Sequence, residues 1–187
     1  FSNNVEVIIA PPSIYLESFV GKVKNFNISS QDVSANDNGA YTGEFSAAML
    51  SSLSLKYSIV GHSERRLYHG ESDEIIFNKA KQLLKSNMSP IYCCGELLED
   101  RKSENHFKVV ASQLQPLLDN LNSDELEKFI IAYEPVWAIG TGLTAKPSDA
   151  QDMHSYIRTL IKKKFSSSIA DQISILYGGS CKPDNAK

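Results

Sequence analysis

Short apolar runs alternate with longer amphipathic stretches along the whole chain, and this alternation constrains the fold more than any other feature. The runs are rich in β-branched residues and are not strictly alternating, which is typical of strands in a parallel sheet covered on both faces. We expect strands at residues 5–10, 28–31, 57–60, 90–93, 129–133 and 173–177. We expect helices near residues 14–23, 46–52, 73–86, 105–118 and 147–164. Repeated strand–helix order predicts an α/β fold with right-handed crossovers.

The spacing of the strands narrows this class. A closed barrel of eight strand–helix units takes ~250 residues, or ~31 per unit. Six strands in 187 residues also give about 31 residues each. No linker or low-complexity block interrupts the chain, so we predict a single domain over residues 1–187. The chain is expected to be an incomplete (β/α)8 barrel with six parallel strands.

An open doubly wound sheet is the alternative architecture. That fold usually carries a glycine-rich turn after its first strand. Here Pro11, Pro12 and Ser13 follow the first strand, and the late Gly140-Thr141-Gly142 opens no GxGxxG pattern. A dinucleotide cofactor is therefore not expected.

Charge and cysteine content exclude several partners. The net charge of −3 argues against nucleic acid or an anionic membrane as the main partner. No apolar run approaches the ~20 residues that span a bilayer, and residues 1–4 do not resemble a signal peptide. Cys93, Cys94 and Cys181 lack metal-ligand spacing, so we expect no metal site. Adjacent thiols on one strand are expected to be reduced in a cytoplasmic protein.

A carboxylate at the end of the fifth strand is the first candidate for chemistry. The apolar run 129–133 ends at Glu134, and Pro135 prevents the strand from continuing its ladder. A lone Trp137, a glycine-rich tip and a helix-start signal at residues 146–149 follow. This order is typical of a catalytic base beneath a mobile lid. For the Glu-Pro pair alone, a capped strand and an ordinary turn remain the alternative.

A histidine after the third strand is the second candidate. The strand ends at Val60, and a short polar helix is expected to begin near Ser63, which places His62 at the positive end of the helix. The helix dipole disfavours imidazolium there, so we expect a neutral ring. A neutral imidazole can donate a hydrogen bond to a substrate oxygen. A structural helix cap is the alternative.

Glycines after the sixth strand are the third candidate. Gly178 and Gly179 precede Ser180, and accessible backbone N–H groups in such a turn bind phosphate. A simple strand-to-helix turn is the alternative.

Taken together, these segments resemble the triosephosphate isomerase family. The matching pieces are residues 132–142, the GHSERR string at 61–66, and residues 175–180, with further pieces at 10–12, 31, 40–44 and 93–96 in the family's order. The resemblance covers essentially the whole chain. It implies a TIM barrel that interconverts dihydroxyacetone phosphate and glyceraldehyde 3-phosphate through an enediolate, without a cofactor, in glycolysis and gluconeogenesis.

The resemblance also implies roles for particular residues. Glu134 matches the base, His62 the electrophile and Glu64 a supporting carboxylate. Glu96 matches a carboxylate that bonds the lid tryptophan, here Trp137. Gly140 and Ser180 match residues that contact the substrate phosphate. Gly178 and Gly179 match residues that shape the loop of Ser180. The lid comprises Pro135, Val136, Trp137, Ala138, Ile139, Gly140, Thr141, Gly142, Leu143, Thr144 and Ala145.

The partner implied by the resemblance is a second copy of the chain. The segment 31–46 resembles a loop that inserts into a neighbouring subunit, and its matching residues are Gln31, Thr42, Gly43 and Glu44. Thr42 would lie near the partner's active site. We therefore expect a homodimer that acts on a small phosphorylated three-carbon substrate.

Two departures from the family pattern limit this reading. The family's first strand supplies an asparagine and a lysine, and its eighth-strand loop a Gly-Gly pair, and these 187 residues hold no counterpart. Leu143 stands where a lysine is common, which leaves hinge kinetics open. We expect little activity from the 187 residues alone. The alternative function is an inactive truncated barrel that acts only in association through its open strand edges.

Overall fold

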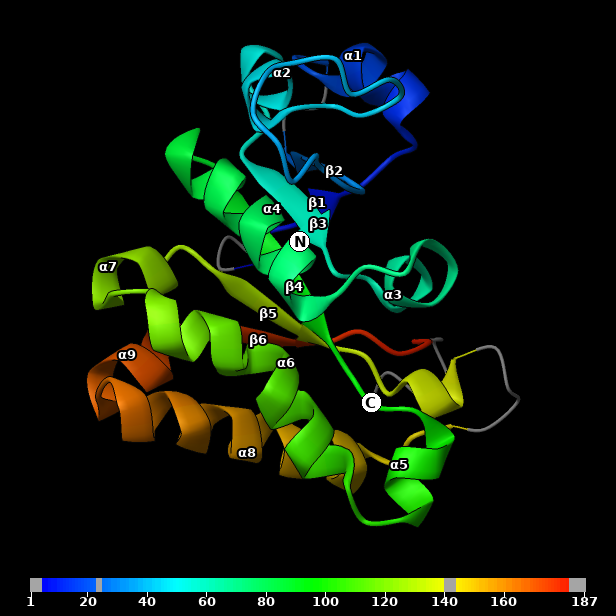
Figure 1. Cartoon of the computed structure of the whole chain (residues 1–187), viewed down its shortest axis with the longest axis vertical. Coiled ribbons are helices and arrows are strands. Elements are labelled where there is room, and N and C mark those ends of the chain that lie inside the picture. The colour runs from blue at the N-terminus through cyan, green and yellow to red at the C-terminus, as the bar shows by residue number, and fades with distance from the viewer. Residues whose placement is uncertain (1–4, 23–24, 140–143, 182–187) are drawn as a thin grey trace. The chain divides into compact units, whose positions relative to one another are not determined.

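A computed structural model describes residues 5–22, 25–139 and 144–181 of the chain (Figure 1). Its strands form one six-stranded sheet in the sequential order β1-β2-β3-β4-β5-β6. Helices separate consecutive strands along the chain. This parallel strand–helix arrangement is the predicted incomplete (β/α)8 barrel. The chain divides into two compact units, unit 1 (Phe1–Gly61 and Glu71–Tyr92) and unit 2 (His62–Gly70 and Cys93–Lys187), and each is described by itself.

Unit 1 contains the first strands and the helices that cover them. Its strands are β1 (Ile8–Ile9), β2 (Asn27–Ser30), β3 (Tyr57–Val60) and the start of β4 (Ser89–Cys94). Its helices are η1 (Ser13–Tyr15), α1 (Leu16–Phe19), α2 (Ala47–Ser52) and α4 (Asp73–Lys85). The pairings are parallel, with Ile8 opposite Asn27, Ser29 opposite Tyr57, and Tyr57 opposite Ser89. Helix α4 buries Ile76, Ala80 and Leu83 at helical spacing, as its amphipathic pattern predicts.

The first helix is shorter than predicted. The periodic pattern suggested residues 14–23, yet η1 and α1 together end at Phe19. Val20 is extended and Gly21 has a φ of 74°, in the left-handed region that terminates helices. Only Leu16 of α1 is buried, so packing does little to lengthen it.

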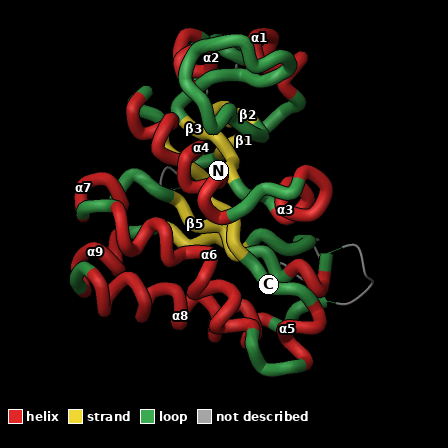
Figure 2. The backbone as a smooth tube through the Cα atoms, viewed as in Figure 1, coloured by secondary structure: helices red, strands yellow, loops and turns green. Residues whose placement is uncertain are grey.

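Unit 2 carries the end of β4, strands β5 (Ile130–Tyr133) and β6 (Ser174–Tyr177), and most of the helices (Figures 1 and 2). These are α3 (Ser63–His69), α5 (Leu98–Lys102), α6 (His106–Asn120), α7 (Ser123–Leu126), η2 (Val136–Ala138), α8 (Pro147–Lys164) and α9 (Ser167–Gln172). Strands β5 and β6 are parallel, with Tyr133 opposite Tyr177. Helices α6 and α8 pack against each other.

Helices α5, α7 and α9 were not predicted. Each has four to six residues, too few for a periodic apolar pattern to stand out. A capping box of Asn122 and Glu125 marks α7, with the Glu125 N–H 2.9 Å from Asn122 Oδ1, and could have revealed it.

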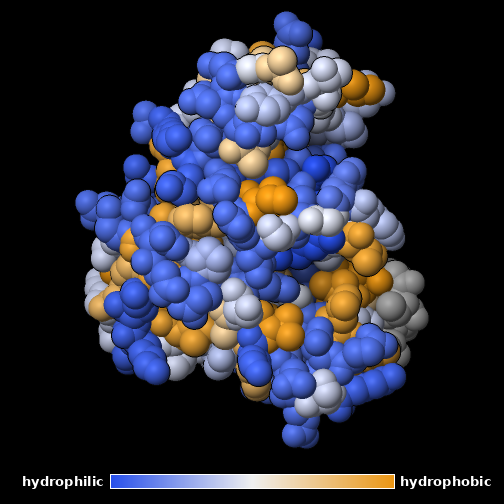
Figure 3. Space-filling model, viewed as in Figure 1, coloured by the Kyte–Doolittle hydropathy of each residue, from blue (hydrophilic) through white to orange (hydrophobic). Residues whose placement is uncertain are grey.

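The two adjacent cysteines of β4 are buried free thiols, whereas Cys181 is an exposed one. Among the described residues, no helix is both long and apolar enough to span a membrane. On the face drawn in Figure 3, hydrophilic residues predominate and hydrophobic residues form separate patches between them.

Candidate active site

Glu134 lies at the carboxyl end of β5, tightly enclosed between Gly95 and Gly178. We call this enclosure the seat of Glu134. Its backbone N–H donates to the Cys94 carbonyl oxygen at 2.8 Å. A Cβ atom added to Gly95 would lie 1.8 Å from the Glu134 carbonyl oxygen, and one added to Gly178 would lie 2.9 Å from Glu134 Cγ. Only glycine permits this close approach on both sides. The residue is 3% exposed, and residues at the ends of β4 and β6 enclose its backbone and the start of its side chain.

The start of α3 holds that carboxylate. His62 Nε2 lies 2.9 Å from Glu134 Oε1, and the Ser63 backbone N–H donates to Oε2 at 2.9 Å. The Ser63 hydroxyl adds a longer contact of 3.4 Å to Oε1. His62 is the N-cap of α3, and its Nδ1 accepts from the Glu64 backbone N–H at 3.3 Å. Two candidates far apart in the chain therefore meet in one hydrogen-bonded pair within unit 2.

The pKa of His62 shifts in the opposite direction from the one expected from the helix dipole. The hydrogen bond to Glu134 raises the pKa of His62 above its ordinary value, and the charges of Glu134 and Glu64 act in the same direction. Partial burial opposes them but is outweighed. The neutral ring expected from the helix dipole took no account of a carboxylate 2.9 Å away. The exposed Glu64 carboxylate is farther off, 3.6 Å from Nδ1.

The turn after β6 contributes to the seat as well as to the candidate phosphate site. The Gly178 N–H donates to the Tyr133 carbonyl oxygen at 2.6 Å. Gly178 thus packs against the Glu134 side chain, a position that phosphate-loop reasoning did not anticipate. Gly179 lies against the Tyr177 ring, where a Cβ would be 2.2 Å from the hydroxyl oxygen. Ser180 is exposed at the end of this turn. Four predicted lid or phosphate residues lie outside the described part of the chain, namely Gly140, Thr141, Gly142 and Leu143.

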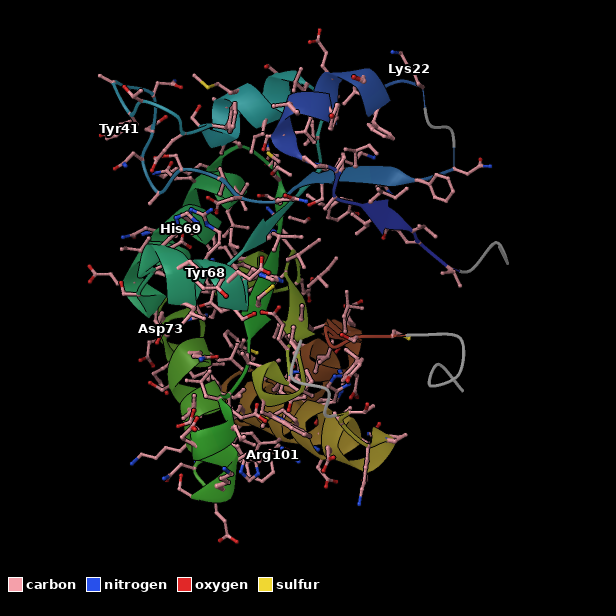
Figure 4. All side chains as sticks on the ribbon, turned by 90° about the vertical axis from the view of Figure 1, so that its right-hand side faces the viewer. Lys22, Tyr41, Tyr68, His69, Asp73 and Arg101 are labelled. Atoms are coloured by element: carbon pink, nitrogen blue, oxygen red, sulfur yellow. The ribbon has the colours of Figure 1, made fainter. Side chains whose placement is uncertain are left out.

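Glu96 is the centre of a buried polar cluster beside the first lid residues. Its Oε1 accepts from the Tyr133 hydroxyl at 2.9 Å, from Trp137 Nε1 at 2.8 Å and from Arg101 Nη1 at 3.2 Å. Burial raises the pKa of Glu96, and these donors oppose the rise. Arg101, labelled in Figure 4, also pairs with Asp149 at 2.7 Å and lies 4.9 Å above the Trp137 ring. The cluster connects η2 with α5 and the first turn of α8.

The segment 31–46 belongs to unit 1 and is ordered by its own hydrogen bonds. Gln31 Nε2 donates to the Ala10 carbonyl oxygen at 3.0 Å, and the Ser34 hydroxyl bonds the Glu44 carboxylate. Tyr41, labelled in Figure 4, and Phe45 are about half exposed at 46% and 47%. Thr42 is exposed beside them, and Gly43 has a φ of 88°. The segment presents aromatic surface on a defined backbone.

Three residues that position the pair were missed by sequence reasoning. Ser63 binds the carboxylate, Gly95 forms one side of its seat, and Gln113 bonds the backbone of Gly95. The string around residue 63 was a usable signal, but a glutamine on a helix carries none. Within the described ranges, no group of three or more His, Cys, Asp or Glu residues could hold a metal ion.

Comparisons with known proteins point in one direction. A family model described as triosephosphate isomerase matches residues 1–187. The triosephosphate isomerase of Flavobacterium johnsoniae is 48% identical over 186 residues, which cover 98% of this chain and 74% of the relative. That of Bacteroides fragilis (strain ATCC 25285) shows the same identity and coverage. The Flavobacterium psychrophilum enzyme is 47% identical over 188 residues, covering 100% of this chain and 75% of the relative.

Proposed function

The chain belongs to the triosephosphate isomerase family, and from this premise we propose that it interconverts dihydroxyacetone phosphate and glyceraldehyde 3-phosphate. The family match over residues 1–187 confirms the resemblance drawn from the motifs, and it implies a phosphorylated triose as substrate. We place the reaction in glycolysis and gluconeogenesis, without a cofactor. The observation that carries the proposal is the contact between Glu134 and His62 at the ends of the strands.

The proposed reaction is a proton transfer between neighbouring carbons. Glu134 removes a proton from the carbon next to the substrate carbonyl, which leaves an enediolate. The hydroxyl proton passes from the oxygen on that carbon to the former carbonyl oxygen, and Glu134 returns a proton to the former carbonyl carbon. The proton count balances, and no oxidant or reductant is needed. A base with a fixed carboxylate suits this task because both carbons must lie within its reach. Burial at 3% exposure and the two glycine contacts support that role.

His62 is the proposed electrophile. Its Nδ1 accepts the Glu64 backbone N–H, so the neutral ring carries its proton on Nε2. A substrate oxygen must take the place of Glu134 at Nε2, since the direct 2.9 Å contact leaves no room between the two groups. That exchange removes the main cause of the raised pKa of His62. The Nε2–H can then stabilise the negative charge that develops on the oxygen.

The remaining proposed roles surround this pair. We propose that Ser180 and Gly140 contact the substrate phosphate, with Gly178 and Gly179 shaping the turn. We propose that Glu64 supports the site electrostatically. The bond between Trp137 and Glu96 supports the idea that this cluster holds the first lid residues, 135–139, in one position.

We also propose a homodimer formed through the segment 31–46. The half-exposed Tyr41 and Phe45 on a hydrogen-bonded backbone favour a partner surface over solvent. Two buried free thiols favour a reducing cytoplasmic compartment. A polypeptide of these 187 residues alone is proposed to turn over slowly, because the lysine and the Gly-Gly pair that the resemblance implies have no counterpart in it.

The test is isomerisation in D2O followed by NMR. We expect dihydroxyacetone phosphate to form from glyceraldehyde 3-phosphate and to carry deuterium at the carbon that receives the proton, because the Glu134 proton exchanges with solvent. Product without deuterium would contradict a base whose proton exchanges with solvent. If conversion does not exceed that of a Glu134→Gln variant, the alternative function is favoured, namely an inactive truncated barrel that acts only in association.

A further inference from the structure

Gln113 on α6 binds both polar groups of one backbone residue. The Gly95 N–H donates to Gln113 Oε1 at 2.8 Å, and Gln113 Nε2 donates to the Gly95 carbonyl oxygen at 2.9 Å. A side-chain amide can give and accept at once, whereas a carboxylate or an ammonium group can do only one. This pairing therefore fixes both the position and the orientation of the Gly95 backbone.

Gly95 is the part of the seat that touches the Glu134 backbone. A Cβ atom on Gly95 would lie 1.8 Å from the Glu134 carbonyl oxygen, 2.8 Å from its carbonyl carbon and 3.3 Å from its Cα. The preceding residue, Cys94, accepts the Glu134 N–H at 2.8 Å. Any shift of the backbone at 94–95 is therefore transmitted to Glu134. The Glu134 carboxylate in turn lies 2.9 Å from His62.

We propose that Gln113 is a positioning residue for Glu134 and acts through the Gly95 backbone. The chain of contacts runs from α6 through two hydrogen bonds to Gly95, and from there to the backbone of Glu134. The proposal rests on the proposed role of Glu134 as the base. Misplacement of a reacting group by about 1 Å can lower a rate ~100-fold. Gln113 thus matters for turnover although it touches no substrate.

A purely structural role is the competing explanation, and a neighbour on the same helix separates the two. Leu117 lies one turn after Gln113 on α6 and is 1% exposed. Leu117→Ala removes core packing but leaves both bonds to Gly95. Gln113→Leu removes both bonds and keeps an apolar side chain of similar size. If Gln113 only stabilises the fold, Gln113→Leu and Leu117→Ala should change the His62 titration and kcat equally whenever they lower the free energy of unfolding equally.

The first readout does not require isomerase activity. The chain has four histidines, and the NMR signal of His62 can be assigned with His62→Gln. Glu134 and Glu64 are the carboxylates that raise the pKa of His62. We expect the His62 titration midpoint in Gln113→Leu to move toward the ordinary histidine value, and the midpoint in Leu117→Ala to stay unchanged. Equal midpoints in all variants, or equal shifts in both, would overturn the proposal.

The second readout is kinetic and uses a near-isosteric variant. A protonated acid in Gln113→Glu can reproduce both bonds to Gly95, but its carboxylate lacks the donor for the carbonyl oxygen. We expect kcat to match the unsubstituted protein at low pH and to fall about 10- to 100-fold below it as pH rises, with KM changed little. A ratio of the two kcat values that does not change with pH would contradict the proposal. This test remains available if Gln113→Leu does not fold.

These outcomes are distinguishable from failure of the proposed function. If the unsubstituted protein does not isomerise triose phosphates while the His62 midpoint still responds to Gln113→Leu, the positioning contact stands and the proposed reaction is wrong. If the protein isomerises but both readouts are insensitive to Gln113, the reaction stands and the positioning role is wrong.

Discussion

Two buried groups of charged side chains, one from each unit, differ in how far they are exposed to solvent. In unit 1, Lys79 Nζ lies 2.7 and 2.9 Å from the Asp32 carboxylate oxygens and 2.6 Å from Glu71 Oε1, and Lys79 is 4% exposed. We call these three residues the lysine cluster. In unit 2, the Glu134 side chain is 4% exposed, but that of its partner His62 is 36% exposed. The cation at the centre of the lysine cluster is buried, whereas the His62 ring of the other group is partly exposed to solvent.

The difference indicates what each arrangement can do. The lysine cluster binds α4 to Asp32, at the start of the segment 31–46, and to Glu71, just before α4. A buried ammonium that gave up such partners would remain uncompensated, so this cluster can only hold the structure. His62 can exchange Glu134 for another polar group from the solvent side. We therefore expect substitutions in the lysine cluster to act on stability and substitutions in the pair to act on turnover.

The largest expected effect comes from replacing Glu134, the proposed base of the pair. Glu134→Gln should lower kcat by about 1,000-fold, within the range for loss of a general base, while KM and the free energy of unfolding change little. The amide oxygen can still accept the Ser63 N–H, so the seat is kept. Steady-state kinetics and urea unfolding measure both sides of this prediction. An unaltered kcat would remove Glu134 as the base.

The next effect breaks the lysine cluster. Lys79→Met should lower the free energy of unfolding by about 3–5 kcal/mol, because the buried carboxylate of Glu71 and the partly buried one of Asp32 lose their cation. The kcat of the folded protein should be nearly unchanged. Lys81→Met is the matched control, since Lys81 is exposed on the same helix. Similar stability losses in both variants would contradict the distinction drawn here.

The Glu96 cluster sharpens the comparison because its central carboxylate is fully buried, yet it adjoins the pair through Tyr133. Trp137→Phe keeps an aromatic side chain but removes the donor to Glu96, and should cost about 1.5 kcal/mol of unfolding free energy. Because Trp137 also belongs to the proposed lid, we expect kcat to change several-fold as well. Urea unfolding and steady-state kinetics on the same samples check both. A change in only one of them would assign the cluster to a single role.

The smallest expected effect concerns pH. Glu134 raises the pKa of His62 in the folded state, so the stabilising contribution is fully present below the ordinary histidine pKa of ~6.5. It is lost as pH rises through the higher folded-state pKa. The stability difference between the unsubstituted protein and His62→Gln should therefore shrink as pH rises above about 6.5. It will be small, because a side chain that is 36% exposed is screened by solvent. A difference in unfolding free energy that grows with pH would contradict a raised folded-state pKa of His62.

The sequence determined the positions of the regular elements wherever a local period extends over several turns. Residues 147–164 were predicted as a helix and form α8 with the same bounds, because Pro147 at its start and a buried stripe of Met153, Ile157 and Ile161 are local signals. All six strands occur where apolar runs predicted them, although β1 is reduced to two residues. The short helices α5, α7 and α9 and the early end of α1 were not predicted, because capping and a single glycine decide them.

The sequence also singled out Glu134 and His62, but only the tertiary structure decided that they touch and what that contact does. Periodicity reports on neighbours within about four residues along the chain. The 2.9 Å contact, the reversed pKa direction of His62 and the seat formed by Gly95 and Gly178 each join segments that lie far apart in the sequence. Gln113 illustrates the same limit, since its amide acquires a meaning only when α6 packs against the end of β4. Electrostatics and backbone packing depend on distance in space, and the sheet that closes those distances forms only when the chain folds.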